Sequence, residues 1–323
     1  MGQNMSYFIW TEIYNCGKIG RIALQSFEKH HPGKKVHVFG FASDFGYLEK
    51  SQNIIPVIIP KRNFFLRVYN RFLNSKKGFP GKIYEEMLKD GFTKGHQGTA
   101  LLWSYIIQNR KEKFLLHFDS DTVFLGNIID EMIEKSREYD IVAPIRNYKN
   151  NPFKNPDFAG FADVAATNCF LFNREKIDRF SFNVLVSMCL GSYNPLGHKV
   201  IDFFDPISFN ILKNSGKIAF LDPDDVGACD VYGLRNNKYA EINNFDTPFK
   251  LDFGNKLIHF SAVGSGMNIY NNACINIPDV YKQYALDRYA LYCKIFYKED
   301  IGVDLSQYQL LLNFFGANVI PRL

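Results

Sequence analysis

The sequence predicts an α/β fold, a largely parallel sheet flanked by helices, followed by a helical C-terminal appendage. One observation is that short apolar runs alternate with segments of helical spacing over the first 145 residues. A second is that Thr11, Asp119 and Asp121 stand at the ends of apolar runs. Ligands bind beyond the carboxyl ends of the strands in such sheets, so these polar residues also mark a candidate site.

Each predicted element follows from the spacing of its apolar residues and from the turn residues beside it. The predicted elements, in order, are a strand at 7–11, a helix at 19–30, strands at 36–40 and 54–59, a helix at 97–108, a strand at 114–118, a helix at 127–137, a strand at 141–143, an apolar segment at 166–172, a helix at 206–214, strands at 217–221 and 257–260, and helices from 278 onward. Pro56 predicts that its strand lies at a sheet edge, because proline has no N–H to donate. We expect one domain over residues 1–277 and a helical appendage over 278–323.

Composition narrows the functional class. The chain has 323 residues, of which 46% are apolar and 22% are charged, as in an ordinary globular protein. The net charge of +5 is spread along the chain without a basic block, which argues against nucleic acid as a partner. This mild charge fits an anionic substrate or the edge of an anionic membrane.

Cysteine usage and hydropathy indicate the compartment. The six cysteines are scattered and form no C-x-x-C pair, which is typical of reduced cysteines in a cytosolic protein. No run approaches the ~20 apolar residues that a membrane span needs. We therefore expect a cytoplasmic protein, with the periphery of the membrane as an alternative location.

The segment Asp119-Ser120-Asp121 is the most informative motif. It follows the apolar run 114–118, which predicts a buried strand. In an extended segment the two carboxylates point to the same side, about 6.5 Å apart. Such a pair suits a divalent cation that also binds phosphate, and this cation would neutralise a departing nucleoside diphosphate. The alternative is a turn in which one aspartate is a cap and the other is solvated.

His259 is the second notable residue. It ends a short apolar strand and precedes Gly264-Ser265-Gly266, for which the sequence predicts a flexible turn. An imidazole completes mixed oxygen and nitrogen sites for Mn²⁺, and the N–H groups of a glycine-rich turn can hold phosphate. A hydrogen-bonded structural histidine is the alternative.

Four segments together resemble the metal-dependent nucleotide-sugar glycosyltransferases of the GT-A fold. They occur in the order found in the retaining group that contains glycogenin and bacterial lipopolysaccharide galactosyltransferases. The segments are 117–128 with Trp103 before it, 167–173, 205–210 and 257–261. The resemblance implies an enzyme that uses Mn²⁺ or Mg²⁺ and transfers a hexose from a nucleotide sugar, UDP-linked, to a cell-surface glycan, glycolipid or lipopolysaccharide acceptor.

The resemblance also implies a role for each candidate residue. Asp121, Asp119 and His259 would hold the metal, and Asp119 would alternatively contact the donor ribose. The remaining roles are base binding for Thr11 and Tyr14, diphosphate neutralisation for Lys94 and His96, phosphate contact for Gly264 and Ser265, donor-sugar binding for Asn168, and a position beside the anomeric carbon for Asp205.

Structural alternatives stay open for several of these residues. Tyr14 is alternatively a loop residue packed on the sheet, and Lys94 and His96 are alternatively solvated. Asn168 is alternatively a strand-end cap. Asp205 is alternatively the N-cap of the helix at 206–214, since Asp before Pro is a frequent cap pair.

The sequence departs from the retaining pattern at several positions. Pro206 stands where the family has Gln, Cys169 stands where a small Ser or Ala is usual, and the family's final K-P-W is missing. The segment Lys94-Gly95-His96 resembles inverting GT-A synthases, so inversion is the first alternative. A sugar nucleotidyltransferase would need a denser glycine loop after the first strand, and a glycan-binding protein would not need the metal.

The tail carries an aromatic stripe. Its members are Tyr281, Tyr284, Ala285, Tyr289, Tyr292, Cys293 and Phe296. One interpretation is a helix that packs on the catalytic domain. The other is an interfacial helix that brings the enzyme into peripheral contact with a membrane that carries lipid-linked acceptors.

Overall fold

The structure is a computed structural model in which part of the chain is described. The described residues are 6–59, 102–103, 106–107, 110–147, 163–165, 168–177, 211, 215–221, 250–252, 256–260, 263–272, 279–309 and 312–313. Within them, none of the helices is long and apolar enough to cross a membrane.

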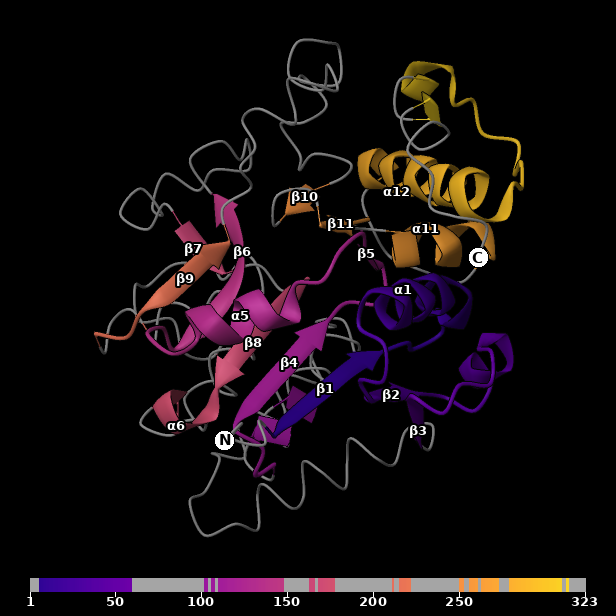
Figure 1. The fold of residues 1–323 in the computed structure, drawn as a ribbon. Coiled ribbons are helices and arrows are strands. Elements are labelled where there is room, and N and C mark those ends of the chain that lie inside the picture. The colour runs from indigo at the N-terminus through magenta and orange to yellow at the C-terminus, as the bar shows by residue number, and fades with distance from the viewer. Residues whose placement is uncertain are drawn as a thin grey trace, which may run out of the picture.

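A mixed sheet forms the centre of the described structure (Figure 1). Its strands, in spatial order, are β3 (Ile54–Ile58), β2 (Val36–Gly40), β1 (Tyr7–Glu12), β4 (Phe114–Phe118), β8 (Cys169–Asn173), β6 (Ile141–Asn147) and β7 (Asp163–Ala165), with β9 (Ile218–Leu221) also paired to β6. Strands β1 to β4 pair in parallel, whereas β8 is antiparallel to both β4 and β6. The predicted, largely parallel sheet is confirmed, and Pro56 lies on the edge strand β3.

Apolar side chains alternate between the two faces of the sheet. In β4, Phe114, Leu116 and Phe118 join one buried cluster, while Leu115 joins a second cluster with Trp103. This period of two is the geometry of a pleated strand that is covered on both faces. It also places His117 on the same face as Leu115, inside the second cluster.

Helix α1 (Gly17–His30) covers the first face with a stripe that includes Ile19, Ile22, Ala23 and Phe27. This spacing is the i, i+3, i+4 pattern of an amphipathic helix. The other helical segments are η1 (Asp44–Tyr47), α5 (Ile129–Lys135), α6 (Arg174–Ile177), α11 (Val263–Tyr270), α12 (Asp279–Tyr292), the π-helix η4 (Cys293–Tyr297) and η5 (Ser306–Tyr308). Positions 102, 103, 106, 107 and 211 are also helical, as predicted, and the rest of their helices lies outside the described residues.

The N-terminus of α1 is capped by a residue from another element. The carboxylate of Asp44 accepts hydrogen bonds from the backbone N–H groups of Asn15, Gly17 and Phe41, at 3.2, 3.3 and 2.9 Å. A side chain at Gly17 would not fit, because its Cβ would lie 2.3 Å from the Asp44 carbonyl oxygen. The first N–H group of this helix is therefore satisfied within the protein.

Buried His31 makes folding stability depend on pH. Its Nδ1 bonds to the Phe27 carbonyl oxygen at 3.2 Å, and its Nε2 accepts from Ile128 N–H at 3.2 Å. Burial lowers its pKa from 6.5 to about 4, so the unfolded chain binds more protons between these values. The contribution of neutral His31 to the free energy of unfolding is therefore fully present above pH 6.5. About 3 kcal/mol of this contribution is lost as the pH falls to 4. Urea unfolding in EDTA at several pH values measures this loss. In His31→Gln, the free energy of unfolding should depend less on pH between 4 and 6.5. An unchanged pH dependence would show that His31 is not its source.

A small antiparallel sheet joins distant parts of the chain. Its order is β10 (Lys250–Asp252), β11 (Leu257–His259) and β5 (Thr122–Phe124). Leu257, Ile258 and His259 pair with Phe124, Val123 and Thr122, respectively. The sheet therefore carries His259 to the end of β4, from which β5 is separated by only three residues.

The segment Gly264-Ser265-Gly266 is a helix and not the flexible turn that its composition predicts. It lies in the first turns of α11, which packs on α12 (Figure 1). A Cβ on Gly266 would lie 1.9 Å from the Ala285 carbonyl oxygen and 2.7 Å from the Tyr289 Cβ. The glycine thus allows two helices to approach closely, and this tertiary contact outweighs its low helix propensity.

Gly266→Ala is expected to destabilise the protein by about 1–3 kcal/mol, because the added methyl must push α11 away from α12. Gly264→Ala is the matched control. Apart from its chain neighbours and the backbone of its own helix, no atom of the described residues lies within 4 Å of its added Cβ, so alanine there should be neutral or stabilise the helix by up to about 1 kcal/mol. Thermal unfolding of both variants measures the difference, and equal melting temperatures contradict the packing argument.

The C-terminal segment packs back onto the start of α1. The Tyr292 hydroxyl donates to the Ile19 carbonyl oxygen at 2.9 Å, and the Tyr297 hydroxyl donates to the Lys18 carbonyl oxygen. Lys18 also pairs with Glu299 at 2.6 Å. The stripe members Ala285, Tyr289, Tyr292 and Cys293 are buried, and Phe296 is partly buried against the core. The packed-helix interpretation is confirmed for these five residues.

Candidate metal centre at the end of β4

The Asp119-Ser120-Asp121 segment is a turn, which corrects the expectation of an extended backbone. The Thr122 N–H donates to the Asp119 carbonyl oxygen at 3.1 Å and closes the turn between β4 and β5. Asn168, directly before β8, holds it from the other side. Its carbonyl oxygen accepts from Asp119 N–H and from the Thr122 hydroxyl, both at 2.9 Å. The turn is thus fixed by three bonds, and its aspartates still converge.

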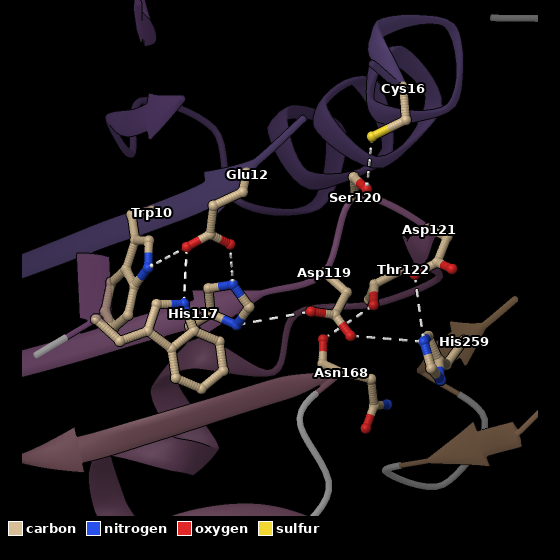
Figure 2. Close-up of polar contacts among 11 residues, drawn as sticks. Trp10, Glu12, Cys16, His117, Asp119, Ser120, Asp121, Thr122, Asn168 and His259 are labelled. Carbon is tan, nitrogen blue, oxygen red and sulfur yellow. Dashed lines mark hydrogen bonds and ion pairs between the residues drawn. The ribbon is translucent and has the colours of Figure 1, made fainter. Parts of the chain in front are cut away.

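The β5–β11 register brings His259 to this turn, as Figure 2 shows. The Phe260 N–H donates to the Asp121 carbonyl oxygen at 3.0 Å and extends the pairing by one residue. As a result, His259 Nε2 lies 3.2 Å from Asp121 Oδ1 and 3.6 Å from Asp119 Oδ2. Two carboxylates and one imidazole therefore meet at the carboxyl end of β4.

This arrangement can hold a divalent cation. One ligand atom from each of Asp119, Asp121 and His259 lies within 4.8 Å of the others, and the side chains are 28%, 16% and 16% exposed, respectively. In octahedral coordination with ligands at about 2.1 Å, neighbouring ligand atoms lie about 3 Å apart. The observed distances of 3.2 and 3.6 Å are close to that value. Partial exposure leaves room for other ligands.

Ser120, between the two aspartates, contacts the start of α1. Its Oγ lies 3.3 Å from the Cys16 Sγ, with which it shares a hydrogen bond (Figure 2). Burial raises the pKa of the Cys16 thiol to about 12, so Cys16 is a protonated structural thiol. In the described part of the chain, Cys16, Cys169 and Cys293 are buried thiols, in agreement with the reduced cysteines that the composition predicts. The helix and the turn are thereby held together at the centre of the motif.

Four other predicted site residues lie in the described part of the chain. Thr11 is fully buried in β1, and its hydroxyl oxygen has no hydrogen-bond partner among the described residues. Tyr14 is partly exposed and its ring lies 5.5 Å from that of Phe41. Burial, and then the charge of Glu12, raise the pKa of Tyr14 well above its usual value. Gly264 and Ser265 are partly exposed in the first turn of α11.

The structure does not test the other predicted roles. Lys94, His96 and Asp205 lie outside the described residues. The side chain of Asn168 is buried, and the bonds given above come from its main chain. Nucleotide, phosphate and sugar binding by the predicted residues stay predictions.

Glu12 was missed by the sequence analysis. Its side chain is 8% exposed, and its Oε1 accepts from the indole N–H groups of Trp10 and Trp103 at 3.1 and 2.7 Å. Its Oε2 lies 2.6 Å from His117 Nε2. Trp10 and Glu12 share a strand face, since they are two residues apart, but the partners from Trp103 and His117 are tertiary. A lone glutamate at a strand end gives no local signal of such burial.

Comparison with known proteins agrees with the fold. No family model matches the sequence, and no curated protein matches it. The fold is that of the GT-A glycosyltransferases, which confirms the predicted fold class. The apo crystal structure of mouse xyloside xylosyltransferase 1 is 13% identical with a TM-score of 0.50, over 79% of this chain and 97% of that chain. The galactosyltransferase LgtC, solved with donor and acceptor sugar analogues, is 13% identical with a TM-score of 0.46, over 85% of this chain and 99% of that chain.

Proposed function

We propose that this protein is a metal-dependent glycosyltransferase that moves a hexose from a nucleotide-diphosphate sugar, UDP-linked, to a cell-surface glycan or lipopolysaccharide acceptor. The observation that carries the proposal is the cluster of Asp119, Asp121 and His259 at the carboxyl end of β4. In α/β sheets this end is where ligands bind. The fold shared with a mouse xylosyltransferase supports sugar transfer as the reaction.

The residues of the proposed site have different roles. Asp119, Asp121 and His259 would hold Mn²⁺ or Mg²⁺, which supplies charge neutralisation to a diphosphate leaving group. Helix α11 begins at Val263, four residues after the end of β11, and its first turn, with Gly264 and Ser265, would offer backbone N–H groups to the same phosphates. Lys94 and His96 would add positive charge, while Thr11 and Tyr14 would hold the nucleoside base.

Retention of configuration is the stereochemical part of the proposal. The order of the motifs supports it, with Asn168 on the donor sugar and Asp205 beside the anomeric carbon, where a carboxylate stabilises an oxocarbenium-like state. If Asp205 is only a helix cap, Asp205→Ala keeps its turnover and loses about 1 kcal/mol of stability. NMR of the product anomer decides the outcome, because a β-linked product from an α-linked donor rejects retention.

A thermal-shift screen tests the function itself. A ligand that binds the folded state raises the melting temperature, so nucleotide sugars are screened with and without Mn²⁺. We expect UDP-hexoses to stabilise the protein only when Mn²⁺ is present. Stabilisation by a nucleoside triphosphate with a sugar phosphate would instead favour a nucleotidyltransferase.

We also propose a cytoplasmic location with peripheral membrane contact through the C-terminal helices. Lys294 and Lys298 are exposed in this region, and basic side chains are attracted to anionic lipid. The buried stripe residues do not contribute to this surface. Co-sedimentation with vesicles of phosphatidylglycerol, compared with phosphatidylcholine alone, tests the contact.

A further inference from the structure

We propose that Glu12 and His117 are positioning residues of the cation site, a buried carboxylate–imidazole pair that holds the Asp119 carboxylate in its ligating orientation. This inference rests on the proposed cation site. Figure 2 shows the sequence of contacts from Glu12 through His117 and Asp119 to His259. It links β1 to the metal cluster through side chains that the sequence did not mark.

The Glu12 carboxylate has a fixed orientation. An indole N–H can only donate, so the bonds from Trp10 and Trp103 hold Glu12 Oε1 as an acceptor at 3.1 and 2.7 Å. Glu12 Oε2 is left for His117 Nε2 at 2.6 Å. Both oxygens of Glu12 are therefore engaged, and the carboxylate cannot rotate without losing a bond in a buried environment.

The His117 imidazole also has a fixed orientation. The His117 side chain is 0% exposed, and three aromatic rings surround it. Its ring centroid lies 4.5 Å from Trp103, 4.9 Å from Phe170 and 5.2 Å from Trp10. With the ring packed on these sides and Nε2 bonded to Glu12, the position of Nδ1 is determined.

His117 Nδ1 faces Asp119. This atom is buried and makes no hydrogen bond among the described residues, yet it lies 4.0 Å from Asp119 Oδ1. The other oxygen, Asp119 Oδ2, lies 3.6 Å from His259 Nε2. One oxygen of Asp119 thus faces the buried pair, and the other faces the metal cluster.

A purely structural role explains this arrangement poorly. A buried carboxylate and a buried imidazole cost desolvation free energy, and apolar side chains of similar size would fill the same space at a lower cost. Ligands of metal ions are usually oriented by such outer partners, whose loss weakens metal binding by about 10- to 100-fold. The position of His117 Nδ1, 4.0 Å from Asp119 Oδ1, gives the pair this second role.

Mn²⁺ binding to the free protein tests the proposal without requiring transfer. Electron paramagnetic resonance of unbound Mn²⁺ gives the Kd of wild type, Glu12→Gln and His117→Phe. We expect both variants to bind about 10- to 100-fold more weakly. His31→Gln is the control at pH 7, because it perturbs another buried histidine that is hydrogen-bonded away from the cluster.

Tryptophan fluorescence supplies a second measurement. The chain has only two tryptophans, and both donate to Glu12 Oε1. Diamagnetic Mg²⁺ should therefore change the emission of the wild-type protein, and His117→Phe should remove this response even at saturating Mg²⁺. If the Glu12–His117 pair were merely structural, the His117→Phe variant would still change its emission when Mg²⁺ binds.

The outcomes separate this inference from the proposed function. If Asp121→Asn loses Mn²⁺ while Glu12→Gln and His117→Phe fold and keep the wild-type Kd within twofold, the positioning role is wrong and the cation site stands. If folded wild-type protein does not bind Mn²⁺ or Mg²⁺, both ideas fall. Weakened binding that is equally large in His31→Gln also overturns the positioning role, since it would reflect lost stability.

Discussion

Asp121→Asn is expected to lower sugar transfer by at least about a hundredfold, and His259→Ala is expected to lower it strongly and to weaken UDP binding in Mn²⁺. Asp121 Oδ1 and His259 Nε2 lie 3.2 Å apart at the centre of the cluster. Asp121→Asn removes a negative charge from this centre, and His259→Ala removes a ligand atom. Losing one group that stabilises developing negative charge costs about 10²–10³ in turnover. Initial rates with a UDP-hexose, with and without Mn²⁺, measure the effect.

Two controls accompany this experiment. Glu134→Gln removes the same charge from an exposed pair with Arg137, at 64% exposure for both side chains, and should keep wild-type turnover. Wild-type protein in excess EDTA should resemble Asp121→Asn. Full activity in EDTA, or in folded Asp121→Asn, rejects the metal assignment.

Tyr292→Ala is expected to lower the free energy of unfolding by about 3–5 kcal/mol, as is typical when a buried aromatic side chain is truncated. The Tyr292 side chain is fully buried, and its ring centroid lies 4.6 Å from Phe296 and 5.2 Å from Phe260. Tyr292→Phe removes only the bond to the Ile19 carbonyl oxygen and should cost about 1 kcal/mol. Chemical denaturation measures these differences in the free energy of unfolding, with the same dependence on denaturant concentration assumed for all variants.

Tyr47→Ala is the matched control, because Tyr47 is 55% exposed. Surface substitutions of this kind change stability by less than about 0.5 kcal/mol. A Tyr292→Ala protein as stable as Tyr47→Ala would show that the C-terminal helices add little to the domain. Such a result would favour a separate appendage after residue 277.

The sequence predicts the central sheet well because its strands are continuous apolar runs. β2 (Val36–Gly40) and β4 (Phe114–Phe118) have the predicted bounds, and β1 differs by one residue. Burial on both faces removes the need for polar alternation, so the pattern is strong and local. The three-residue strands β5 and β10 are too short to carry such a signal, and β5 in addition pairs with β11, which lies far away in the sequence.

The candidate site could be predicted in part, for physical reasons. Asp119, Asp121 and His259 follow apolar strands, and strand ends meet at one edge of a parallel sheet. Gly266 was placed in a turn because glycine is usually a turn residue, whereas here it allows α11 to approach α12. Glu12 was missed because its burial depends on donors from three positions that only the folded chain brings together.

The pairing of β5 with β11 also has a consequence for protein synthesis. Asp121 and His259 are 138 residues apart in a chain that is made from its N-terminus. At about 5–20 residues per second, a ribosome needs roughly 7–28 s to reach His259 after Asp121. During this interval the nascent chain has two of its three cation ligands and an unpaired β5. We therefore expect stalled chains that end before β11 to lack high-affinity Mn²⁺ binding and to expose the apolar residues Val123 and Phe124 to chaperones.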